Sequence, residues 1–236
     1  MATILVLGAS GMLGSIVDLY FRKKTNHNVF STHRCSDSPT ERMFHFDAAE
    51  DPGGLKRILD AAGTLFRLHG IDAVGVDAIM HAAGLTHGGF YAHFPSKEAL
   101  VAEASAASLA RSAARWERIS LEEGGEAALQ RIVGGYLDPA HVAAVQHGCV
   151  LATLGPEVAR RPASRPAIAA SIRTMLAALV RCLPGRRRQQ ALTALATMVG
   201  AVVLARLADE PGLSDEFLTA ATESLLSHAG ARPDLP

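Results

Sequence analysis

Three glycines near the N-terminus have the spacing of a loop that binds phosphate. Gly8, Gly11 and Gly14 stand in the stretch GASGMLG, between an apolar segment at residues 3–7 and an amphipathic segment at residues 13–22. At such a strand-to-helix turn, glycine lets the backbone approach a pyrophosphate closely, and the helix N-terminus stabilises the negative charge. The chemistry that this pattern favours is the binding of a dinucleotide.

Residues 1–53 resemble the opening of the extended short-chain dehydrogenases, in particular the sugar-nucleotide reductases and epimerases. The resemblance rests on GASGMLG and on an expected order of strand, helix, strand and strand, with the strands at residues 3–7, 28–33 and 43–46. It implies a short, truncated Rossmann-like β-α-β-β segment. By this resemblance the three glycines, Arg34 and Asp47 would bind the cofactor. Arg34 implies NADP because arginine pairs with a 2′-phosphate, and Asp47 matches the acid that contacts adenine.

These residues do not complete an enzyme. The catalytic Tyr-x-x-x-Lys of that family occurs once, from Tyr20 to Lys24, at the end of the first expected helix and far too early in the chain. Such a short pattern arises often by chance. We therefore expect no catalytic residues and no required cofactor, with NADP as the dinucleotide that the resemblance allows.

A second group of polar and small residues lies between two short helical segments and a long one. Residues 76–83 and 87–94 are expected to be helices joined by a turn at Gly84, which is the layout of a helix-turn-helix. Thr86 is placed to cap the second of these helices, and Ser96 to cap the long helix that follows. Gly88 and Gly89 are poor helix formers, and close approach of the backbone to DNA would explain them.

The stretch VDAIMHAAGLTHGGFYAHFPSKEAL at residues 76–100 resembles the DNA-binding region of the TetR/AcrR transcriptional regulators. With the preceding helix and a weaker likeness to the chain end, the resemblance covers residues 54–236. It implies that Phe90 and Phe94 are core residues and that Lys97 contacts phosphate. The DNA-facing residues implied by the resemblance are Thr86, His87, Gly88, Tyr91, His93 and Lys97.

The remaining residues that could do chemistry give weaker patterns. His87 and His93 are six positions apart, not the four that place two ligands on one helix face, so we expect no metal site. The three cysteines are too few and too scattered for a disulfide framework, which favours a reducing, cytoplasmic setting. By the TetR/AcrR resemblance, the helix within residues 141–160 would line the effector cavity. Cys149 in that segment is either a small buried apolar residue or a sensor of oxidants.

The composition is that of a globular protein, with 49% hydrophobic and 19% charged residues. Lys plus Arg and Asp plus Glu both number 23, so the formal net charge is zero. This balance argues against a protein that coats nucleic acid through bulk charge, but it allows a small local surface that reads DNA.

Residues 191–205 form an uncharged run that is shorter than the roughly 20 apolar residues of a membrane span. We expect no membrane partner and interpret the run as part of an interface helix. Together with the helix at residues 214–226, it would form a four-helix bundle across the two-fold axis of a homodimer. Val202, with small residues at Ala194, Ala201 and Ala205, is expected to lie in that interface.

The sequence therefore predicts a mainly α fold, a TetR-like helical repressor preceded by the Rossmann-like segment. The expected domains are residues 1–53, a DNA-binding domain at 54–101, and an effector-binding and dimerisation domain at 102–236. The expected function is a one-component DNA-binding transcriptional regulator, a repressor that a small-molecule effector releases from operator DNA. The alternatives are a fragment of an NADP-dependent sugar-nucleotide reductase or epimerase, and a redox-sensing fusion of an NADP-binding segment with a repressor.

Overall fold

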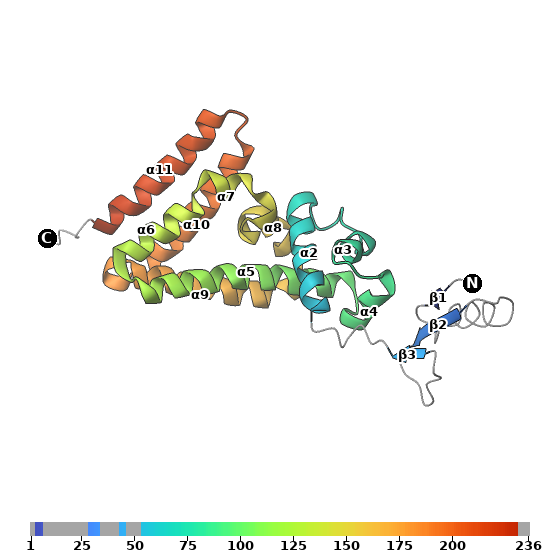
Figure 1. The fold of residues 1–236 in the computed structure, drawn as a ribbon. Helices are drawn as coiled ribbons and strands as arrows, with labels where there is room; N and C mark the ends of the chain where they lie inside the picture. The colour runs from blue at the N-terminus through green and yellow to red at the C-terminus, as the bar shows by residue number, and fades with distance from the viewer. Residues whose placement is uncertain (1–2, 7–27, 34–42, 46–52, 231–236) are drawn as a thin grey trace. The chain divides into compact units, whose positions relative to one another are not determined.

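The computed structural model describes residues 3–6, 28–33, 43–45 and 53–230 of the chain. The chain divides into two compact units, Met1–Lys56 and Arg57–Pro236. Strands β1, β2 and β3 lie in the first unit, and the helices from α3 onward lie in the second (Figure 1).

The strands of the first unit are parallel. β1 (Thr3–Val6), β2 (Asn28–His33) and β3 (Met43–His45) form one sheet in the order β1-β2-β3. Thr3 pairs with Asn28 and Ser31 with Met43. The strands lie where the sequence predicts them. The cofactor residues implied by the dehydrogenase resemblance lie outside the described residues: Gly8, Gly11, Gly14, Arg34 and Asp47.

Helix α2 (Gly54–His69), most of which lies in the second unit, packs into the core through one apolar stripe. It fully buries Ile58, Ala62 and Phe66, which are spaced one turn apart. Gly70 ends the helix with a φ of 82°, a conformation that glycine adopts without steric cost, and its N–H donates to the Phe66 carbonyl at 2.8 Å.

The next helices form the predicted helix-turn-helix with one difference. α3 (Val76–Ala82) is followed by Gly84 at a φ of 69°, as the turn requires. The expected helix at residues 87–94 is divided into a 3₁₀ turn η2 (His87–Gly89) and a single α-helical turn α4 (Phe90–His93). Two adjacent glycines have weak helical preference, and this explains the tighter first turn.

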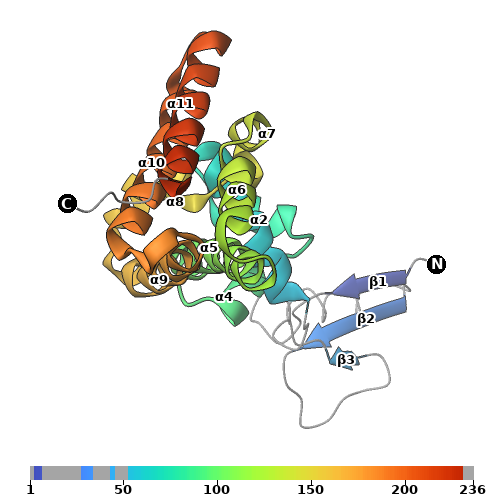
Figure 2. The same ribbon diagram turned by 90° about the vertical axis from the view of Figure 1, so that its left-hand side faces the viewer.

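The rest of the second unit is a bundle built on a long central helix. α5 (Lys97–Glu122) begins after Ser96, whose side chain accepts a hydrogen bond from the Ala99 N–H at 3.2 Å, so the predicted cap is confirmed. α9 (Arg165–Cys182) lies alongside α5, and Figure 2 looks nearly along both. The other elements are α6 (Gly125–Tyr136), α7 (Pro139–Ala143), η3 (Val145–His147), α8 (Val150–Ala159), η4 (Pro162–Ser164), η5 (Pro184–Arg186), α10 (Arg188–Leu207) and α11 (Pro211–Gly230).

Helix α10 is apolar on two faces. One face packs inside the subunit, where Val202 is fully buried and Ala194, Ala201 and Ala205 are buried with it. The expectation that these four residues lie between subunits is therefore wrong, because α9 and α11 already cover them. The other face leaves Leu192 41%, Leu204 44% and Leu207 75% exposed. By length and composition α10 could cross a membrane, but 39% of its most apolar window is buried within the fold.

Candidate nucleic-acid interface and effector cavity

The outer surface of α3, η2 and α4 carries the polar and small residues that the sequence singles out. Thr86, His87 and Gly88 are exposed, and Tyr91 is 64% exposed. His93 and Lys97 are half-buried at the end of this surface. The structure thus places all six on or beside one short recognition segment, residues 86–97. Because its side chain is 64% exposed, Tyr91 is not a core residue.

The inner side of the recognition segment is aromatic and packs into the core. Phe90 and Phe94 are each 1% exposed and stack at a ring-centroid distance of 5.8 Å, as core residues should. The Tyr91 ring stands edge-on to Phe90 at 5.2 Å and to His87 at 6.0 Å. A short helix is therefore held rigidly from below while its polar face remains open to a ligand.

Polar contacts fix the two ends of the recognition segment. His87 pairs through Nδ1 with the Asp77 carboxylate, which joins η2 to α3. Lys97 donates to the Asp72 carbonyl at 3.5 Å, a long hydrogen bond that leaves its charge uncompensated. Thr86 occupies the capping position of η2, but its side chain accepts no hydrogen bond there. The predicted Thr86 cap is wrong, and the hydroxyl is instead exposed.

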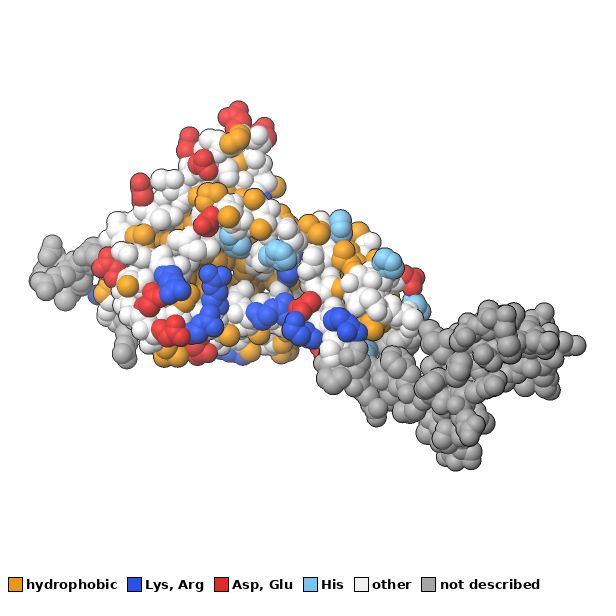
Figure 3. Space-filling view, in the orientation of Figure 1, with side chains coloured by type: hydrophobic (Ala, Val, Ile, Leu, Met, Phe, Trp, Pro, Cys, Tyr) orange, Lys and Arg blue, Asp and Glu red, His pale blue; other side chains and the backbone are white. Residues whose placement is uncertain are grey.

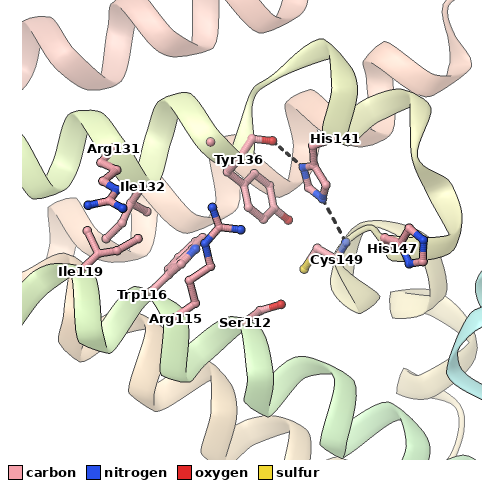
Figure 4. A pocket seen from close by; sticks show the side chains of 11 residues that line it. Ser112, Arg115, Trp116, Ile119, Arg131, Ile132, Tyr136, His141, His147 and Cys149 are labelled. Carbon is pink, nitrogen blue, oxygen red and sulfur yellow. Dashed lines mark hydrogen bonds between the residues drawn. The ribbon is translucent and has the colours of Figure 1, made fainter. Parts of the chain in front are cut away.

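The helical body contains a second candidate site, a cavity of about 100 Å³ between α5, α6 and the loop before α8 (Figure 4). Its apolar wall is formed by Trp116, Ile119 and Ile132. The other lining residues are polar or small: Ser112, Arg115, Arg131, Gly135, Tyr136, His141, His147 and Cys149. Figure 3 shows Lys and Arg side chains in a row along α5, the helix that supplies the floor of this cavity.

His141 is held in its neutral form. Its Nδ1 lies 2.6 Å from the Tyr136 carbonyl, to which it donates, and its Nε2 accepts from the Cys149 N–H at 3.1 Å. A ring that accepts at one nitrogen and donates at the other is the neutral tautomer. Burial is the main cause that lowers the pKa of His141, and Arg206 and Arg115 lower it further, against the raising effects of the Tyr136 carbonyl and Asp138.

This arrangement predicts a stability that falls in mild acid. The unfolded chain binds a proton on His141 near pH 6.5, whereas the folded chain does so only at lower pH. Stability is therefore lost as the pH falls through about 6.5, at up to about 1.4 kcal/mol per pH unit for one proton. Urea unfolding between about pH 7.5 and 5.5 measures this slope. His141→Gln, which does not titrate, should give a shallower slope; an equal slope would contradict the assignment.

Tyr136 and Cys149 face each other at the end of the cavity. The Tyr136 ring contacts Trp116 edge-on at 5.6 Å, and its buried hydroxyl lies beside the Cys149 thiol without a hydrogen bond of ordinary geometry among the described residues. Burial, and then the adjacent Cys149, raise the pKa of Tyr136 well above its ordinary value. Cys149 is 4% exposed and precedes the first residue of α8.

Two sets of polar contacts join the segments next to the cavity to the DNA-binding helices. Arg67 on α2 is 6% exposed and donates to the Gln146 carbonyl at 2.8 Å and to Ser108 at 2.5 Å. At the other end of α8, the Glu157 carboxylate accepts from the Ile71 N–H at 2.9 Å. Arg161, one turn further, bonds to Asp72 at 2.5 Å. The loop and helix that bound the cavity therefore hold the turn between α2 and α3.

Of this second site, the sequence predicts only the side formed by residues 141–160, which contributes His141, His147 and Cys149. Arg67 and Glu157 lie in helical segments where a charged residue is ordinarily solvated. The partners of Arg67 are 79 and 41 positions away, and the partner of Glu157 is 86 positions away. The one available signal was Arg67, which follows Phe66 directly on the buried side of an amphipathic helix. In the described part of the chain, no cluster of His, Cys, Asp and Glu could hold a metal ion.

An exposed polar recognition segment on a rigid helix-turn-helix, attached to a helical body, defines a DNA-binding transcriptional regulator rather than an enzyme. Residues 58–104 match the model of the bacterial regulatory proteins called the tetR family, so the match covers the helix-turn-helix and the start of α5. No curated protein matches the chain.

Solved structures share the fold of the whole second unit. The reduced form of NemR from Escherichia coli is similar with a TM-score of 0.64 and 21% identity, over 77% of this chain and all of that one. A TetR-family regulator from Agrobacterium tumefaciens gives 0.63 and 23% identity, over 76% and 98%. The fatty acid degradation regulator FadR from Bacillus halodurans gives 0.59 and 18%, over 78% and 99%. At these identities the likeness establishes a mainly helical, TetR-like fold.

Proposed function

We propose that this chain is a homodimeric repressor that binds operator DNA through residues 86–97 and leaves it when a small molecule enters the cavity beside Cys149. The observation that carries the DNA contact is the two-sided recognition segment, whose aromatic side is buried while its polar side is open. Tyr91 and the Gly88 backbone face outward to meet base edges and phosphates. Lys97 supplies positive charge at the start of α5.

The second copy is proposed to dock on α10. Its outer face is apolar, with Leu192, Leu204 and Leu207 exposed in a stripe that the subunit itself leaves uncovered. If α10 packs against α10 of a second copy across a two-fold axis, the apolar stripes of both copies are buried. The two recognition segments would then face successive major grooves. This replaces the earlier expectation that the inward residues of α10 form the contact.

Release is proposed to run through α8. A molecule that enters the cavity meets Cys149 at the start of this helix, and Glu157 and Arg161 near its end hold Ile71 and Asp72. A shift of α8 would therefore change the spacing of the two recognition segments and favour a dimer that no longer fits DNA. A wider hollow of about 330 Å³ lies between α6, α10 and α11. The cavity beside Cys149 is the better effector site because these links adjoin it.

The first unit has a separate proposal. Three adjacent parallel strands are compatible with the start of a dinucleotide-binding fold. The order of the strands is the observation that supports a proposal of NADP binding by residues 8–14. The repressor function needs no cofactor. With no membrane partner proposed, the cytoplasm is the compartment in which such a regulator meets its DNA.

Gly88→Ala tests the DNA contact without disturbing the fold. A Cβ built at Gly88 meets no atom within 4 Å, and alanine is favoured over glycine in helices by about 1 kcal/mol. We expect an unchanged or slightly raised melting temperature. Affinity for duplexes enriched from a random pool should fall at least about tenfold, because the added methyl group would separate the backbone from phosphate.

Gly134→Ala is the matched control, since its Cβ also meets nothing and the residue lies on α6 away from the recognition segment. This variant should bind the enriched duplexes as the parent does. If Gly88→Ala also keeps full affinity, the DNA surface lies elsewhere.

A further inference from the structure

We propose that the cavity beside Cys149 binds a short-chain monocarboxylate, with the carboxylate held by Arg115 and Tyr136. The inference rests on the proposed role of this cavity as the effector site and adds the chemical class of the effector. Three independent features of the cavity lead to it: the charge of its lining, an unpaired donor inside it, and its size.

The lining is cationic. It contains two arginines and no aspartate or glutamate. Arg131 is neutralised by Glu123, to which it is ion-paired. Arg115 makes no ion pair within the described part of the chain, and Arg206 lies close enough to act on both Tyr136 and His141. A neutral His141 adds no charge. The free charge at the cavity is therefore positive, which favours an anion.

An unpaired donor points into the same space. The Tyr136 hydroxyl is buried beside the Cys149 thiol, a weak partner, and makes no hydrogen bond of ordinary geometry to the described residues (Figure 4). Its raised pKa keeps the proton on the oxygen, so it donates a hydrogen bond and cannot act as a second anion. A buried hydroxyl without an ordinary hydrogen bond is unfavourable in the empty protein, and a carboxylate oxygen would satisfy it.

The size of the cavity and its wall limit the rest of the ligand. The volume of about 100 Å³ is well below the roughly 300–1,000 Å³ of pockets for drug-sized ligands, and is about three times the volume of one water molecule in the liquid. Trp116, Ile119 and Ile132 add an apolar surface to the same lining. Together these features fit a carboxylate with a short apolar tail, such as propionate or butyrate.

Trp116 provides a direct readout because it is the only tryptophan of the chain and lines the cavity. Butyrate and propionate, added to the full-length protein at constant ionic strength, should change its fluorescence saturably. Butyramide, which has the same shape without the charge, should bind at least about tenfold more weakly. Equal binding of butyrate and butyramide, or no saturable change with either acid, would overturn the proposal.

Two variants test the named contacts. Arg115→Gln should weaken butyrate binding at least about tenfold, whereas Arg118→Gln, an exposed arginine of α5 outside the lining, should not. Tyr136→Phe should weaken binding while leaving the melting temperature unchanged or higher, because the lost hydroxyl makes no hydrogen bond of ordinary geometry within the protein. Unchanged butyrate affinity in Arg115→Gln would contradict the assignment.

The fluorescence titration needs no DNA, so it separates this proposal from the repressor function. One outcome is that butyrate binds saturably and through Arg115 without releasing the protein from its enriched duplexes. That result would support the carboxylate site and contradict its role as the effector site. Duplex binding that persists while Trp116 reports no carboxylate would uphold the DNA contact and overturn the site.

Discussion

Leu204→Glu is expected to give a folded monomer that no longer holds operator DNA. Leu204 is 44% exposed within one subunit, so the subunit tolerates a charge there, whereas in the proposed dimer two unpaired carboxylates would be buried face to face. Breaking such an interface with unpaired buried charge costs about 3–5 kcal/mol. Sedimentation measures the loss of the dimer, and the loss of a second half-site removes most of the operator affinity.

Two controls make this result specific. Ala114→Glu places the same charge on an exposed position of α5 and should leave the dimer intact. Val202→Glu places it on the inward face of the same helix, where the residue is fully buried, and should unfold the subunit itself. A Leu204→Glu protein that sediments as a dimer would show that the second copy docks on another face.

Tyr91→Ala and Lys97→Ala should weaken DNA binding in different ways. Tyr91 is outward-facing and can reach base edges, so its removal should cost about 1–3 kcal/mol on the preferred duplex and much less on random DNA. Lys97 would contact phosphate, so its removal should weaken binding to all sequences and lower the salt slope by about one. Fluorescence anisotropy across a salt series measures both effects.

His69→Ala serves as the control for these two variants, since His69 is exposed at the end of α2 outside the recognition segment. It should bind both kinds of duplex as the parent does. Unchanged discrimination in Tyr91→Ala together with an unchanged salt slope in Lys97→Ala would mean that the recognition surface is misassigned.

The DNA-binding helices could be predicted closely because their signals are local. Phe66 and Gly70 mark the stripe and the end of α2, and Ser96 caps α5 where the sequence places it. The split of the recognition segment at Gly88 and the uncapped Thr86 were not predicted. Both depend on how a four-residue helix is held against the core, which propensities do not describe.

The effector cavity could be predicted only on the side formed by residues 141–160, because distant segments form the rest. The cavity exists only where α5 and α6 meet the loop before α8. Arg67 and Glu157 acquire their partners only when α2, α5 and α8 meet, whereas periodicity alone gives both a solvated position. The same limit explains α10. The sequence shows that α10 has more apolar residues than one packed face needs. Which face packs inside the subunit depends on α9 and α11, so Val202 was assigned to the wrong face.

The most direct test of sequence-specific DNA binding is a selection of duplexes from a random pool by the full chain at moderate salt. A dimer with two recognition segments should enrich a two-fold symmetric site, whose half-sites lie about one helical turn apart or a multiple of it. Recovery of no enriched sequence, or of a site without symmetry, would contradict the assignment of residues 86–97 as the DNA-reading surface of a dimeric regulator.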